Sequence, residues 1–219
     1  MTPKLMNPLG NAVFFSALVK AMAIGKWSFI VGSHAAFFTI APVIVPLSGA
    51  FAGVFGSFAF FVLNLSVRMV LTSTPLLSLL AHHIPGLCSS LYWSLPSRLP
   101  SFFIALACIA LFINHPVGSA AALYSLFWVI PMITIWCGSS LFANAVGSTF
   151  IAHAVGSVIW LYTVPMTADA WLMLIPTVCV ERVLCIVGML MAYPIFSWFF
   201  SVLHISWPMP LWRTVQMRD

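Results

Sequence analysis

The sequence predicts an all-α membrane protein, a polytopic bundle of transmembrane helices forming a single domain over residues 1–219. Hydrophobic residues make up 63% of the chain and charged residues 5%, whereas an ordinary soluble domain has about 25% charged residues. Eight basic and three acidic residues are too few to cover a soluble fold of this size. At about 20 residues per span, the length accommodates about six spans and no large extramembrane domain.

The first two apolar segments differ from plain lipid-facing spans. A run at about 11–31 contains Lys20 and Lys26. A second run, at about 35–48, contains two prolines and is too short to cross the hydrocarbon core. We expect this short proline-containing segment to be a tilted helix or a re-entrant segment whose backbone is covered by protein.

The later segments are longer, with one polar interruption. A long span extends from Gly49 to about Val70. Residues 73–98 contain His82, His83, Pro85, Pro96 and Arg98, a mixture typical of a loop with an interfacial helix. The remaining spans are expected at about 100–114, 117–137, 140–163 and 171–197.

The distribution of basic residues favours six spans. If 35–48 does not cross, both termini lie on one side of the membrane. The basic residues that share this predicted cytoplasmic side, as the positive-inside rule requires, are then Lys4, Arg68, Arg98, Arg213 and Arg218. Counting 35–48 as a full span gives seven and separates Lys4 from the arginines of the tail. Seven spans therefore stay open as the alternative.

Glu181 and Arg182 lie far inside the last expected span. This span begins near Trp171, so Glu181 is about 15 Å along it, near the middle of the bilayer. A charge at that depth costs at least a few kcal/mol unless it is paired or hydrated. Both residues are candidate ligand-binding residues, with a structural ion pair as the alternative.

A polar and aromatic stripe marks the span at 140–163. His153 shares nearly one helical face with Thr149 and Trp160, an arrangement suited to a small polar ligand. The alternative is a histidine that hydrogen-bonds a neighbouring helix.

Two further candidates lie nearer the N-terminus. His34 precedes the proline-containing segment, where a loop would cap a binding site; the alternative is an exposed loop histidine. Asn64 shares a helical face with Arg68 at a spacing of four residues. The alternative is that the Arg68 side chain simply extends to the membrane interface.

Several function classes lack their motifs in this sequence. It has no HExxH, GxSxG, Walker GxxxxGK[ST] or GxGxxG pattern, so we assign no catalytic residues and no cofactor. The five cysteines have no CxxC spacing and suggest no metal site. The net charge of +5 reflects scarce acids and membrane topology, so we expect no nucleic-acid partner.

Three short patterns in residues 12–70 resemble the substrate-binding S components of energy-coupling factor (ECF) micronutrient transporters. Ala17-x-x-x-Ala21 is similar to the AxxxA motif with which that family docks its transmembrane T component. The segment 32–38 is similar to the loop that covers the ligand. Residues 46–56, PLSGAFAGVFG, are similar to the family's small-residue run between its second and third helices.

The resemblance implies an S-component-like subunit for uptake of a vitamin or other micronutrient. Its expected partners are a small-molecule substrate, an ECF T component with ATPases, and the lipid bilayer. Its expected location is a prokaryotic cytoplasmic (inner) membrane. The alternatives are a membrane-embedded enzyme that uses His153 or His34 as acid or base, and a structural or assembly membrane protein without a ligand. A conventional secondary transporter is disfavoured because no inverted repeat is visible.

Overall fold

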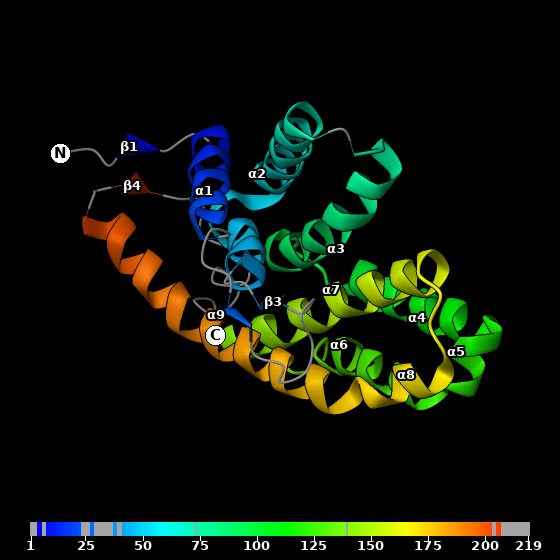
Figure 1. Cartoon of the computed structure of the whole chain (residues 1–219). Helices are drawn as coiled ribbons and strands as arrows, with labels where there is room; N and C mark the ends of the chain where they lie inside the picture. Colours follow the sequence, from blue (N-terminus) through cyan, green and yellow to red (C-terminus); the bar gives the residue numbers. More distant parts are fainter. Residues whose placement is uncertain are drawn as a thin grey trace.

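The structure is a computed structural model, and its description covers residues 4–5, 8–22, 27–28, 37–38, 41–72, 74–138, 140–202 and 205–206. It is mainly helical (Figure 1). The helices are α1 (Pro8–Met22), α2 (Ala41–Leu71), α3 (Leu76–Ser94), α4 (Leu99–Asn114), α5 (Pro116–Ala120), the 3-10 helix η1 (Ala122–Trp128), α6 (Val129–Ile133), α7 (Leu141–Thr163), α8 (Ala168–Met173) and α9 (Ile175–Val202). Four two-residue strands form two pairs, β1 (Lys4–Leu5) parallel to β4 (Ile205–Ser206) and β2 (Trp27–Ser28) antiparallel to β3 (Phe37–Phe38).

The predicted helical class is confirmed, and the helices have the character of a membrane protein. Three stretches in the described part of the chain are long and apolar enough to cross a bilayer: Ala41–Leu71, Leu141–Thr163 and Ala168–Val202. The last of these joins α8 to α9. The count of six spans stays a prediction.

Helix α2 is divided into two arms at Gly53. Its backbone there has φ 69° and ψ −170°, a region open essentially only to glycine. Ser48 and Ser57 lie on opposite sides of the break, yet both hydrogen-bond the Ser90 hydroxyl, at 2.9 and 2.8 Å. Nine residues of straight helix would separate them by about 13.5 Å, so the chain folds back at Gly53.

The first arm of α2 corresponds to the short proline-containing segment, shifted toward the C-terminus. It runs from Ala41 to Ala52, not over 35–48, and most of its residues are buried. Protein therefore covers its backbone, as membrane burial requires. Gly49 meets the backbone carbonyl of Ser90, where no β-carbon fits, so this arm packs closely on α3.

Helix α3 occupies most of the segment expected to be a loop with an interfacial helix. Its 19 residues pack between α2 and α7, with Tyr92 and Trp93 almost fully buried. Arg68 precedes this helix and Arg98 follows it, and their placement on one side of the membrane stays a prediction. The histidines and prolines of this segment thus belong to a longer helix than the sequence indicated.

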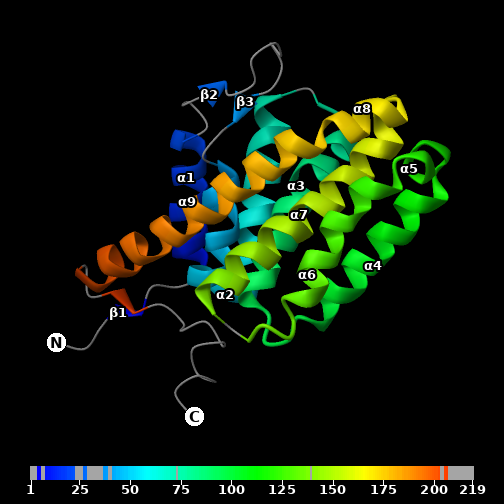
Figure 2. The same cartoon turned by 90° about the horizontal axis from the view of Figure 1, so that it is seen from below.

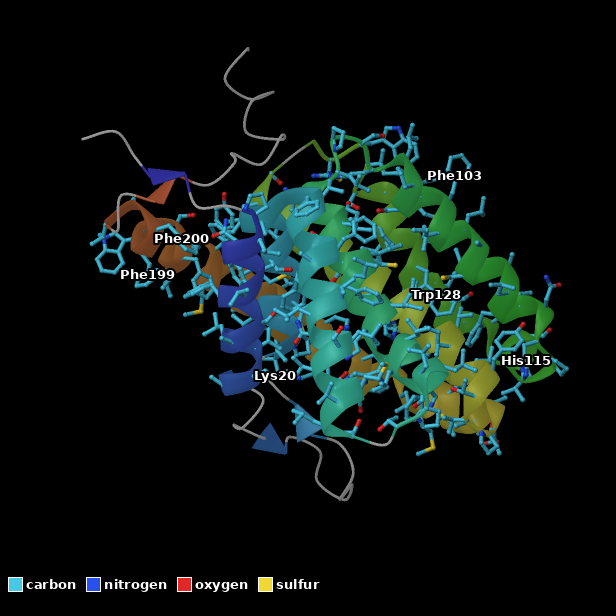
Figure 3. All side chains as sticks on the ribbon, turned by 90° about the horizontal axis from the view of Figure 1, so that it is seen from above. Lys20, Phe103, His115, Trp128, Phe199 and Phe200 are labelled. Atoms are coloured by element: carbon cyan, nitrogen blue, oxygen red, sulfur yellow. The ribbon has the colours of Figure 1, made fainter. Side chains whose placement is uncertain are left out.

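Arg68 and Lys20 lie at the same end of the helical bundle. Asn64, one turn before Arg68, hydrogen-bonds Ser16, one turn before Lys20, so the second arm of α2 runs parallel to α1. Figure 3 shows Lys20 and His115 at one end of the bundle and Phe103 toward the other.

The remaining predicted spans agree with the structure to different degrees. Helices α4 and α7 match the expected ranges to within a residue. The range 117–137 is divided into α5, η1 and α6, because Gly118 packs on the Phe112 carbonyl and Pro131 lacks a backbone donor.

Two aromatic clusters form the core. One joins α1, α2 and α9 around Phe15, Phe51 and Phe200. The other joins the chain from α4 to α8 around Phe112 and Trp128, with Trp171 in contact with Phe112. Figure 2 shows α7 between these two halves.

Candidate ligand-binding cavity

A cavity of about 340 Å³ lies where α1, α2, α3, α7 and α9 meet, nearer the end that holds Lys20. Its walls are mainly apolar, with a few convergent polar groups, the usual composition of a small-molecule site. The apolar side includes Val19, Pro42, Val45, Pro46, Phe60, Phe61 and Leu87. The polar side consists of Asn64, His82, His83, Ser89, Thr149 and Arg182.

Proline residues shape the backbone on two walls. Pro46 lies inside α2 and Pro85 inside α3, and both line the cavity. Because proline has no N–H, the carbonyls four residues earlier, of Pro42 and Ala81, lose their ordinary helical donor. Gly86 follows, and a β-carbon there would come within 3.0 Å of Val45. The proline–glycine pair thus brings α3 close to the first arm of α2.

Three buried polar atoms at this cavity have no hydrogen-bond partner within the described part of the chain. They are Nε2 of His83, Oγ1 of Thr149 and Nε of Arg182. They come from α3, α7 and α9. Leaving such a group unpaired costs about 1–3 kcal/mol, more if it is charged, and native proteins have few of them. All three belong to residues that line the cavity.

Arg182 and Glu181 interact only loosely. Nη2 of Arg182 lies 3.4 Å from Oε2 of Glu181, and the exposed fractions are 17% for the arginine side chain and 34% for the glutamate. Arg182 lines the cavity, whereas Glu181 does not. The expected pair therefore exists, but its cation faces the cavity and its anion is the more exposed partner.

Asn64 both supports the fold and borders the cavity. It is 3% exposed, and its Nδ2 donates to the Ser16 hydroxyl at 2.9 Å and to the Phe60 carbonyl at 2.8 Å. The bond to Ser16 holds α1 against the second arm of α2. Together with Thr149 and Arg182, it is one of three sequence-predicted ligand residues that the structure brings to one cavity.

His153 does not line the cavity and instead contacts η1. Its Nε2 is 2.8 Å from the Tyr124 hydroxyl, and Nδ1 accepts a longer bond of 3.4 Å from Nε1 of Trp128. Since Nδ1 accepts, the neutral ring carries its proton on Nε2 and donates it to Tyr124. Thr149 and His153 are about 40° apart around the helix. Thr149 therefore lines the cavity, whereas His153 contacts η1.

The other candidates are not brought to the cavity. Trp160 is half exposed, and its Nε1 donates to the sulfur of Met166 at 3.0 Å. His34 lies outside the described residues. Ala17 and Ala21 are both exposed on α1. Their role in partner docking stays a prediction.

Sequence reasoning missed His82 and His83 as site residues. Their ring centroids lie 5.2 Å apart on α3, and both border the cavity. The adjacent histidines, just before Pro85, would have indicated a polar helical face if the segment had been interpreted as a helix. Within the described ranges, no group of three His, Cys, Asp or Glu side chains is arranged to hold a metal ion.

Comparison with known protein families, curated proteins and solved structures finds no match to this chain.

Proposed function

We propose that this chain is a membrane-embedded substrate-binding protein that captures a small molecule in the cavity between α2, α3, α7 and α9. The observation that carries the proposal is the set of three unpartnered polar atoms on three helices, of His83, Thr149 and Arg182, around one mainly apolar space. An occupant supplies the missing polar contacts and covers the apolar wall. The cavity volume falls in the range of small-molecule sites, about 300–1,000 Å³.

We further propose that binding serves uptake, as in an S component of an ECF-type transporter. Val19 on α1 and Ala41 at the start of α2 both line the cavity. The exposed Ala17 and Ala21 leave one face of α1 open for close contact with a T component. Energy for transport would come from that partner and its ATPases.

Native mass spectrometry of protein purified from its own membranes tests the capture step. We expect the wild type to carry a bound small molecule that dissociates on activation. Ala152→Phe places a ring from α7 in the cavity, because Ala152 lines it. The variant is expected to lose the bound mass while retaining a cooperative thermal transition.

Ala110→Phe is the matched control. Ala110 is exposed on α4 and does not line the cavity, so this variant should keep the bound mass. Equal retention of the ligand by a folded Ala152→Phe protein would contradict the assignment to this cavity. Wild-type protein that emerges without any bound small molecule would contradict tight capture.

A further inference from the structure

The end of the bundle that contains the cavity is strongly basic. Lys20, Arg68 and Arg182 contribute permanent positive charges there, and Lys20 and Arg68 lie within electrostatic range of both cavity histidines. In the part of the chain that the structure describes, the carboxylates are Asp169 and Glu181. Asp169 begins α8 and does not line the cavity. Glu181 is thus the one described carboxylate beside a cavity wall.

Arg182 keeps donor capacity that Glu181 does not use. A guanidinium is always charged and presents five N–H donors, but only Nη2 reaches Glu181, at 3.4 Å. Its Nε is buried without a partner in the described residues. A partly buried cation with an unpaired donor at a cavity wall favours an anionic occupant, because pairing offsets the cost of its burial.

We propose that the occupant is a small organic monoanion, a carboxylate on a compact apolar body. This inference rests on the proposed capture function and specifies its substrate class. The carboxylate accepts from the guanidinium of Arg182, with Thr149 on the same cavity wall as a second polar residue. The apolar body lies against the wall that contains Phe60 and Phe61.

A monoanion suits this wall better than a phosphate ester. Among the cavity-lining residues that the structure describes, Arg182 is the one permanently charged side chain. A single carboxylate balances that charge, whereas a phosphate dianion would leave charge uncompensated in a mainly apolar space. The two histidines and Thr149 add polar contacts without adding a permanent charge.

Two matched ligand series test the charge of the occupant. Hexanoate, hexanamide and hexylamine share one chain, and benzoate, benzamide and benzylamine share one ring. Each compound is titrated against detergent-solubilised protein, with the thermal transition as readout. We expect at least one carboxylate to raise the transition temperature in a saturable manner, its amide to act at least about tenfold more weakly, and its amine to have no effect.

Substitutions of Arg182 and Glu181 should change the affinity for a carboxylate in opposite directions. Arg182→Gln should weaken carboxylate binding by about tenfold or more. Glu181→Gln should strengthen it, because it removes a competing carboxylate from Arg182. Lys20→Gln, which removes a nearby positive charge that does not line the cavity, should weaken binding much less than Arg182→Gln does. If Arg182→Gln fails to fold, the opposite effect of Glu181→Gln still decides the question.

The outcomes separate this proposal from the capture function. Saturable binding of an amide or amine in preference to its carboxylate, lost in Ala152→Phe, would overturn the anionic class and leave capture intact. Weakened carboxylate binding in Glu181→Gln would overturn the role of Arg182. A wild-type protein that no carboxylate stabilises would also overturn the anionic assignment. The capture function is tested separately, by the bound mass in native mass spectra.

Discussion

Ser48 and Ser57, nine positions apart in the sequence, both hydrogen-bond the hydroxyl of Ser90. The fold-back of α2 at Gly53 makes this possible and places both of its arms against α3. The cavity lies beside this contact, with Pro46 on the first arm and Phe60 on the second. One turn in the backbone therefore builds two walls of the proposed site.

Replacing Gly53 should weaken the whole bundle. Any side chain there is forced into a backbone region that costs about 1–3 kcal/mol, although the space around the position is open. We expect Gly53→Ala to lower the free energy of unfolding by that amount in detergent. Gly156→Ala is the control, since its β-carbon would meet Pro85 at an ordinary 3.6 Å. Equal stability of the two variants would contradict the turn.

The two faces of α1 should respond differently to the same substitution. Ala12 is fully buried and Ala17 is exposed. Ala12→Leu overpacks the core and should cost about 1–3 kcal/mol of stability, whereas Ala17→Leu should change it by less than about 0.5 kcal/mol. If Ala17 docks a T component, Ala17→Leu should nevertheless abolish copurification with that component. Normal copurification of the folded variant would reject the docking role.

Thr149→Val should separate stability from binding. The Thr149 hydroxyl is buried without a partner in the described chain, so an isosteric apolar side chain should leave the ligand-free protein equally or more stable. The same change removes a polar contact from the cavity. Affinity for the carboxylate that stabilises the wild type should fall about fivefold or more. Unchanged affinity would exclude Thr149 from the site.

His153→Phe should have the reverse effect. The ring joins α7 to η1 through Tyr124 and Trp128, and its loss should lower stability by about 1–3 kcal/mol. Because His153 does not line the cavity, carboxylate affinity should stay within twofold of wild type. Loss of binding in a folded variant would restore the interpretation of His153 as a ligand residue.

The sequence patterns predict single helices better than their partners. Helix α7 was predicted to within a residue because a long run without proline or charged residues follows Ser140, whose side chain accepts from the Ala143 N–H as a helix cap. The full length of α3 was not predicted, because its histidines and Pro85 indicated a loop with only an interfacial helix. In the structure these polar groups face the cavity and Pro85 packs near Gly156.

The candidate site was predicted only in part for a similar reason. Periodicity placed Thr149, His153 and Trp160 on nearly one face. It contains no information on which neighbouring helix covers each part of that face. Depth in the last span indicated that at least one of Glu181 and Arg182 faces the protein interior, and in the structure Arg182 lines the cavity whereas Glu181 does not.

Photocrosslinking with 4-azidobenzoate tests the central claim most directly, because the probe is itself an aromatic carboxylate. After irradiation of the purified protein, peptide mass spectrometry maps the attached residues. We predict labelling of cavity-lining segments of α2, α3 or α7, around Phe60, Pro85 or Ala152, suppressed by excess benzoate and absent in Ala152→Phe. Labelling confined to exposed surfaces such as that of α4, insensitive to benzoate and unchanged in Ala152→Phe, would contradict a carboxylate-binding cavity.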